Sequence, residues 1–193
     1  MIPPSPDFQD FLNHLTENAI GSLRNADAIA RGNGNPYVGT EHLLLGVLAQ
    51  ESSMGAKLLD GAGVTLSKAR SILSVQATPL KVSEAKGLSE VAKLTLRMAY
   101  ELAHEFGQDF VGTEHILYSI LSQKNARAAE LLRDLSVSVE GLLQELEQFL
   151  QRQQESGGGM SSARKSKKQK KTALDFFGTD LTAEARRNKL DPV

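Results

Sequence analysis

The chain has 193 residues, of which 40% are hydrophobic and 23% charged, and its formal net charge is −1. It contains no cysteine and no tryptophan, which excludes thiol catalysis, cysteine-ligated zinc and a disulfide framework. This length fits one compact domain of about 150 residues plus a tail, and such a domain buries roughly 70% of the surface that its unfolded form exposes, so an apolar core without cross-links is sufficient.

The near-zero net charge conceals an uneven distribution along the chain. Residues 1–152 hold 13 basic and 18 acidic side chains, whereas residues 153–193 hold 9 basic and 5 acidic ones. The start, MIPPSPDFQDFLNHL, carries acids where a secretory signal carries basic groups, and no apolar run approaches the ~20 residues that span a bilayer. We therefore expect a soluble, cytoplasmic protein with an acidic body, a basic tail and no membrane partner.

Apolar residues at helical spacing predict four helices in the first half and four in the second. The first four cover residues 16–31, 40–50, 53–60 and 66–75. The second four run from a Ser89 cap to near Gly107, and over residues 114–123, 126–135 and 139–150. No run with the alternation of a β-strand competes, so the expected fold class is all-α.

The two halves repeat each other at an offset of 73 residues. YVGTEH at 37–42 returns as FVGTEH at 110–115, and each copy precedes an apolar run. Identical residues continue beyond the hexapeptide, for example Leu44 and Leu117, Leu48 and Leu121, Gln50 and Gln123, Leu59 and Leu132, and Val64 and Val137. This self-similarity indicates an internal duplication, and we expect an eight-helix domain with pseudo-twofold symmetry.

These patterns divide the chain into six segments. Residues 1–14 form an N-terminal extension, 15–78 the first repeat, 79–87 a connector and 88–152 the second repeat. Residues 153–173, which include QQESGGGMSSARKSKKQKK, bury too little apolar surface to order themselves and are expected to be a flexible basic linker. Apolar residues return in the segment 174–193.

The first helix has two possible starts. Thr16 aligns with Ser89 at the 73-residue offset, which predicts a helix that Thr16 caps. Upstream, however, Phe8, Phe11 and Leu12 continue the same helical period. A helix running through would leave Thr16 in its interior, and the sequence leaves both possibilities open.

The doubled hexapeptide marks the start of the second helix of each half. Glu41 and Glu114 place negative charge at the positive end of the helix dipole. His42 and His115 are expected to orient a buried backbone carbonyl rather than to bind a metal. Four residues are expected to build the turn and the N-cap: Thr40, Thr113, Gly39 and Gly112. A cap contributes ~1 kcal/mol, so stability alone is a sufficient reason for the motif.

The same physics also permits a ligand site at each exposed helix start. The free N–H groups of a helix N-terminus suit a phosphate, and a carboxylate beside them suits a guanidinium group. A ligand that carries both groups on one side chain would satisfy both. The site requires that Glu41 and Glu114 lie at the surface rather than in the core.

The pattern GTEH-[LI]-L, with GAKLL or AAELL after it and V-[ST]-[LV] before the fourth helix, resembles the N-terminal domain of the Clp AAA+ unfoldases, most closely the ClpC type. The resemblance covers residues 15–152. It implies two tandem four-helix Clp repeats. The tail LDFFGTDLTAEARRNKLDPV is similar to the segment that leads into the first ATPase module of those proteins, so residues 174–193 are expected to be the start of that segment without the module.

The resemblance implies a non-enzymatic domain that captures adaptor and client proteins for a Clp ATPase and its protease partner. In ClpC-type relatives this domain also binds phosphorylated arginine, through the Glu of each GTEH and a Ser or Thr that caps the first helix of each half. These positions fall on Glu41 and Glu114, with Thr16 and Ser89 each 25 residues upstream. GNGNPY at 32–37 replaces EFGQDF at 105–110, so the two sites are not expected to be equivalent.

Other functions find less support in the sequence. GNPYVGTE at 34–41 lacks the lysine of a phosphate-binding loop, and neither HExxH nor GxSxG occurs, so we expect no enzyme, cofactor or metal site. A basic cluster without interleaved aromatic residues predicts no specific nucleic-acid recognition: Arg164, Lys165, Lys167, Lys168, Lys170 and Lys171. Two alternatives stay open, a free-standing regulator that competes with the full-length unfoldase for adaptors, and a basic-tailed helical scaffold associated with nucleic acid.

Overall fold

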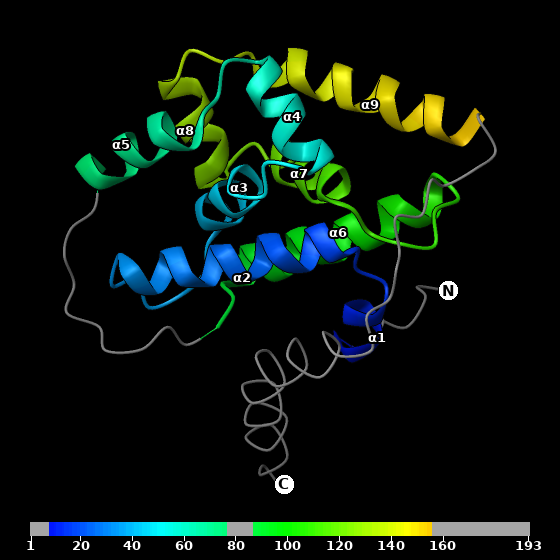
Figure 1. Cartoon of the computed structure of the whole chain (residues 1–193), viewed down its shortest axis with the longest axis horizontal. Helices are drawn as coiled ribbons and strands as arrows, with labels where there is room; N and C mark the ends of the chain where they lie inside the picture. Colours follow the sequence, from blue (N-terminus) through cyan, green and yellow to red (C-terminus); the bar gives the residue numbers. More distant parts are fainter. Residues whose placement is uncertain (1–7, 77–86, 156–193) are drawn as a thin grey trace, which may run out of the picture.

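The computed structural model describes residues 8–76 and 87–155, and within these ranges the regular structure is helical (Figure 1). The all-α class expected from the periodicity is confirmed. The helices are α1 Phe8–Asn13, α2 Glu17–Gly32, α3 Thr40–Leu48, α4 Met54–Gly61, α5 Leu66–Gln76, α6 Glu90–Glu105, α7 Thr113–Leu121, α8 Arg127–Asp134 and α9 Val139–Glu155. Most of the expected connector and linker, and the whole segment 174–193, lie outside the described residues. The last helix, α9, continues to Glu155 and so includes the first residues of the expected linker.

The central helices α3 and α7 are the most apolar of the fold. Every residue of α3 is buried, and seven of the nine residues of α7 are buried. In Figure 1, α2 and α6 run below this central pair, and α4, α8 and α9 lie above it. Helix α2 packs along α3, and α6 packs along α7. The helix starts that carry the GTEH motif are therefore buried together with the helices that they begin, apart from the half-buried Glu114.

The two halves contact each other through equivalent residues. A parallel backbone bridge joins Leu15 to Val111, and a second joins Val38 to Leu88. The 73-residue offset relates the two bridges, because Leu15 corresponds to Leu88 and Val38 to Val111. Each bridge therefore joins the equivalents of the two residues that the other bridge joins. This reciprocal pairing confirms the expected pseudo-twofold arrangement of two tandem four-helix units.

The N-terminal extension forms a helix of its own. Helix α1 ends at Asn13, and the chain then pairs with Val111 through Leu15 before α2 begins. The ring of Phe11 packs edge-on against Tyr100 of α6, with 6.2 Å between the ring centroids. The alternative of one continuous helix through Thr16 is therefore wrong, because backbone pairing interrupts the helical period before Thr16. Thr16 caps α2 by accepting a hydrogen bond from the Ala19 N–H, 3.2 Å long.

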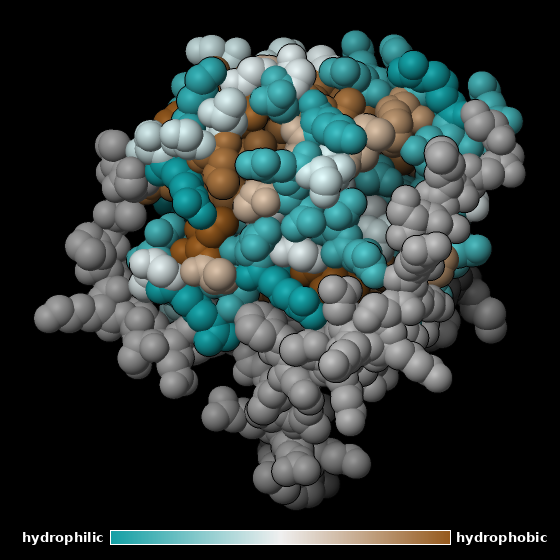
Figure 2. All heavy atoms as spheres, viewed as in Figure 1, coloured by the Kyte–Doolittle hydropathy of each residue, from teal (hydrophilic) through white to brown (hydrophobic). Residues whose placement is uncertain are grey.

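A groove of about 1220 Å³ opens in the first half between α2, α3, α4 and α5. Its lining includes the apolar side chains of Leu45, Leu48 and Leu73, with Glu51 and Arg70 among the charged ones. In Figure 2 hydrophobic atoms reach the surface on the side of the molecule where α5 lies. The groove is separate from the residues of the GTEH motifs, none of which lines it.

Candidate functional site

The start of α3 and the start of α7 are built in the same way. Gly39 and Gly112 hold the N-cap positions with extended backbone, and Thr40 and Thr113 are the first helical residues. The expectation that the threonines cap their own helices is therefore wrong. The glycines precede the helix as expected, but neither helix has a side-chain hydrogen bond from its N-cap residue.

The two histidines stabilise these helix starts instead. Nδ1 of His42 accepts a hydrogen bond from the Gly39 N–H, 3.0 Å long, and Nδ1 of His115 accepts one from the Gly112 N–H, 2.9 Å long. The expected partner of each ring, a backbone carbonyl, is thus replaced by a backbone donor. Burial lowers the pKa of His115 to about 4. Burial also lowers the pKa of His42, an effect that Glu41 opposes and Arg127 reinforces. Both rings are therefore neutral at pH 7.

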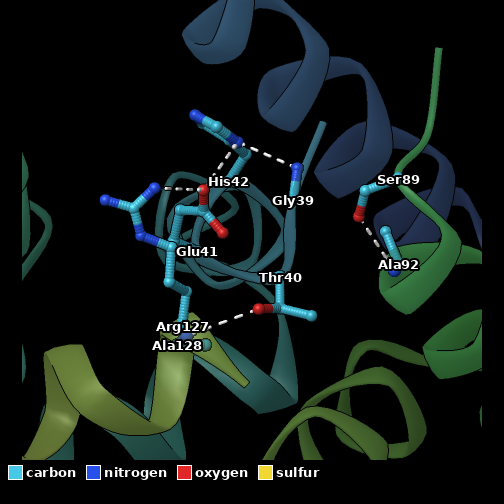
Figure 3. A network of polar contacts seen from close by, with 8 residues as sticks. All are labelled: Gly39, Thr40, Glu41, His42, Ser89, Ala92, Arg127 and Ala128. Carbon is cyan, nitrogen blue, oxygen red and sulfur yellow. Dashed lines mark hydrogen bonds and ion pairs between the residues drawn. The ribbon is translucent and has the colours of Figure 1, made fainter. Parts of the chain in front are cut away.

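The threonine hydroxyls cap helices of the opposite half. Oγ1 of Thr113 accepts a hydrogen bond from the Gly55 N–H in the first turn of α4, and the bond is 3.0 Å long. Oγ1 of Thr40 accepts one from the Ala128 N–H in the first turn of α8, at 3.4 Å (Figure 3). Helix N-termini have N–H groups without intrahelical partners. Each threonine therefore accepts a hydrogen bond from an N–H group that has no partner within its own helix, in the opposite half. The GTEH motif therefore joins the halves as well as starting a helix.

Helix starts from the two halves also lie side by side. The Thr16 N–H donates to the Val111 carbonyl over 3.0 Å, which brings the start of α2 to the segment that precedes Glu114. The Ser89 N–H donates to the Val38 carbonyl over 3.0 Å, which brings the start of α6 to the segment that precedes Glu41. Ser89 caps α6 by accepting from the Ala92 N–H, 3.2 Å long, and appears beside the GTEH residues in Figure 3. Thr16 is therefore brought to the motif of Glu114, and Ser89 to the motif of Glu41. The pairs form between the halves, and not between residues 25 positions apart in one half.

Glu114 lies at the start of α7 with its carboxylate folded back over Gly112. A Cβ built on Gly112 would collide with both carboxylate oxygens. The side chain is 14% exposed. Burial raises the pKa of the Glu114 carboxyl, while hydrogen bonds from the backbone and from Thr113 act in the opposite direction. Among the described residues, no lysine or arginine forms an ion pair with this carboxylate.

Glu41 has the same position at the start of α3 but a different neighbour. Its side chain is 8% exposed, so Glu41 is buried and the surface position expected from the sequence is wrong for this residue. Nη1 of Arg127, on the opposite half, lies 3.9 Å from Oε1 of Glu41, and the Arg127 side chain is 54% exposed (Figure 3). Glu41 is thus covered by a side chain that itself reaches solvent. Arg127 was not among the predicted site residues. The duplication does contain a signal for it, since the equivalent first-half residue is the uncharged Met54.

Other kinds of site find no residues in the described part of the chain. Within residues 8–76 and 87–155, no three His, Asp or Glu side chains gather in a way that could hold a metal ion. None of the helices in these ranges has the length and apolar character needed to cross a membrane.

Comparison with known proteins places the chain in a family. The profile of the Clp repeat N-terminal domain matches residues 14–87 and again residues 87–174. An ATP-dependent Clp protease ATP-binding subunit ClpA homolog from Trieres chinensis is 33% identical in an alignment 189 residues long, which covers 93% of this chain and 21% of that protein. Chaperone protein ClpC3, chloroplastic, from Oryza sativa subsp. japonica is 33% identical in an alignment 187 residues long, which covers 93% of this chain and 20% of that protein. The chain therefore spans about a fifth of the length of these relatives.

Solved structures share the fold. The N-terminal domain of the chaperone ClpD from Arabidopsis thaliana superposes with a TM-score of 0.63 at 24% identity, covering 72% of this chain and 99% of that one. The ClpV N-domain in complex with a VipB peptide gives a TM-score of 0.61 at 18% identity, covering 78% of this chain and 95% of that one. Two profile matches in tandem, on two halves that pack through equivalent residues, establish that this chain belongs to the Clp repeat N-terminal domain family.

Proposed function

We propose that this chain is a non-enzymatic binding domain that captures adaptor and client proteins for a Clp-type ATP-dependent unfoldase. The relatives that it matches are subunits of Clp proteases and Clp chaperones, and the chain corresponds to about a fifth of their length. A domain of this fold from ClpV was solved with a peptide, which supports protein partners in general. The proposal also includes that the domain acts together with Clp ATPase modules and a protease, and that it is located in the cytoplasm.

We propose further that the start of α7 recognises phosphorylated arginine through Glu114 and the adjoining start of α2 at Thr16. One observation carries this: two helix starts from different halves meet beside one carboxylate that has no basic partner among the described residues. Paired helix N-termini provide N–H groups and a positive dipole end for a phosphoryl group. The carboxylate supplies the acceptor that a guanidinium group needs. Glu41 with Ser89 forms the equivalent arrangement in the other half.

The raised pKa of Glu114 agrees with such a role. A carboxylate held in a poorly solvated position lacks a compensating charge, and an incoming guanidinium group would supply it. Two neighbouring helix dipoles would then stabilise the phosphoryl group on the same side chain. An unmodified arginine would gain only the first of these interactions, so the site should prefer the phosphorylated form.

Calorimetric titration of the full chain with a peptide containing one phosphoarginine tests this proposal. Binding should be lost or weakened at least about a hundredfold in Glu114→Ala, since breaking a desolvated charged hydrogen bond costs about 3 kcal/mol. Glu140→Ala is a matched control, because Glu140 is also an acid in the first turn of a helix, α9, but is exposed. A peptide with unmodified arginine should bind more weakly. Equal binding by the wild type and Glu114→Ala would contradict the proposal.

The two alternatives from the sequence find no added support. The basic cluster at residues 164–171 lies outside the described residues, so a scaffold associated with nucleic acid rests on composition alone. A free-standing regulator and a domain of a longer unfoldase would use the same binding surface. Both are therefore consistent with the site proposed here.

A further inference from the structure

The two halves differ at one residue beside the GTEH carboxylates. Arg127 is the first residue of α8 and Met54 is the first residue of α4, and the two positions correspond at the 73-residue offset. The neighbouring residues are bound equivalently, since Thr40 accepts from Ala128 and Thr113 accepts from Gly55. Each first residue therefore stands beside the GTEH motif of the opposite half. The Glu41 carboxylate lies 3.9 Å from the guanidinium group of Arg127, and the position equivalent to Arg127 is held by the uncharged Met54.

Arg127 occupies the space that a cationic ligand would need at Glu41. Its Nη1 is 3.9 Å from the carboxylate, too long for a hydrogen bond but close enough for charge attraction (Figure 3). The Glu41 side chain is buried beneath it. A second guanidinium group that approached Glu41 would meet a like charge at short range and would have to displace this side chain.

We propose that Arg127 is a specificity-determining residue that closes the Glu41 site to guanidinium ligands, so that the domain has one functional site, at Glu114. This inference rests on the proposed function, because it assumes that Glu114 receives a phosphoarginine side chain. Met54 is the residue that leaves the Glu114 site open. The side chain of Met54 is half-buried, uncharged and unbranched, so it has no positive charge that would compete for the Glu114 carboxylate.

The duplication thus has an asymmetric outcome. Two copies of one helix start keep the contacts that join the halves, since Thr40 and Thr113 both cap a helix of the opposite half. The charged side chain of Arg127 on α8 leaves these contacts between the halves in place and closes the Glu41 site to ligands. Both copies join the halves, and only the Glu114 copy also binds a ligand.

Calorimetric stoichiometry with the single-phosphoarginine peptide tests the inference on the full chain. The wild type should bind one peptide per chain, and Arg127→Met should bind two, because it gives the Glu41 site the neighbour that the Glu114 site has. Met54→Arg should weaken binding at the remaining site at least about tenfold. Arg127 is more than half exposed, so Arg127→Met should keep the thermal stability of the wild type.

Single-site variants separate the possible results. In the Arg127→Met background, Glu41→Ala should return the stoichiometry from two to one, because it removes the carboxylate of the second site. Two sites in the wild type, or a single site in Arg127→Met, would overturn the inference while the proposed function stands. No binding by either form would remove the proposed function, and this inference with it. If Met54→Arg fails to fold, the Arg127→Met titration decides alone.

Discussion

The hydroxyl of Thr113 accepts a hydrogen bond from the backbone N–H of Gly55, a residue 58 positions earlier in the other half of the molecule. Thr113 is 1% exposed and the bond is buried. The equivalent bond from Ala128 to Thr40 completes the reciprocal pair at 3.4 Å. A motif that starts a helix in one half therefore also caps a helix in the other, which ties the positions of the binding residues to the assembly of the two halves.

Thr113→Val should reduce the free energy of unfolding by about 1–3 kcal/mol, because it leaves the buried Gly55 N–H without an acceptor while the side-chain shape is kept. Chemical denaturation measures the change. Thr40→Val should have a smaller effect, since the bond that it removes is longer. Thr113→Ser, which keeps the hydroxyl, should recover the hydrogen bond. Equal stability of Thr113→Val and the wild type would show that the bond contributes nothing net.

Helical periodicity predicted most helix bounds closely. The expected ranges 66–75 and 126–135 compare with α5 Leu66–Gln76 and α8 Arg127–Asp134. These helices bury one apolar stripe, and a local pattern is enough to locate such a stripe. The doubled pattern likewise predicted the pseudo-twofold fold, because equivalent sequences fold into equivalent units.

The errors concern partners that are distant in the sequence. Threonine is a common N-cap residue, but Thr113 is the first residue inside the helix, and its hydroxyl accepts a hydrogen bond from Gly55 in the other half. The pairing of Thr16 with the segment before Glu114 also depends on how the halves meet. No local pattern encodes such contacts. The choice between a continuous helix and a Thr16 cap, which the sequence left open, depends on a contact of the same kind, because the backbone pairing between Leu15 and Val111 interrupts the helix.

The stability of the domain should decrease as the pH falls from about 6.5 toward 4, in the range set by His115. Burial lowers the pKa of this imidazole from 6.5 to about 4 in the folded state. Within that window the unfolded chain binds a proton that the folded chain does not, so the free energy of unfolding decreases as the pH falls. A shift of this size corresponds to about 3 kcal/mol. Protonation of Nδ1 would also remove the acceptor of the Gly112 N–H.

His115→Gln provides the measurement for that pH dependence. Glutamine at this position can accept from the N-cap N–H as histidine does, but it does not titrate. Denaturant unfolding across the window should give a shallower slope of stability against pH for the variant. Glu114 acts in the opposite sense, because its raised pKa favours the folded state at low pH and this contribution is lost as the pH rises. The comparison should therefore be repeated in a Glu114→Gln background, and identical slopes there would contradict the role of His115.

Gly46→Ala should destabilise the domain by about 1–3 kcal/mol, because α2 and α3 are in close contact at this residue. A Cβ on Gly46 would collide with the backbone carbonyl of Ser22 and would lie 3.0 Å from the Cβ of Ala26. Neither atom is the end of a flexible side chain, so the helices must separate. Gly32→Ala is the control, since a Cβ there would meet no heavy atom within 4 Å. The equivalent residue in the second half is the buried Ser119, so Ser119→Gly should leave a small cavity instead of relieving a contact.

Gly112→Ala should abolish phosphoarginine binding while the domain remains folded. The backbone at Gly112 is extended, with φ −94° and ψ 176°, which alanine adopts without strain. A methyl group there would displace the Glu114 carboxylate, which is the flexible end of a side chain, so the change in stability should stay within about 0.5 kcal/mol. Gly39→Ala is the matched variant, because it displaces Glu41 in the same way. If only the Glu114 site binds, calorimetry should find peptide binding lost in Gly112→Ala and retained in Gly39→Ala. Retained binding in Gly112→Ala would mean that the position of the Glu114 carboxylate over the helix start does not govern recognition.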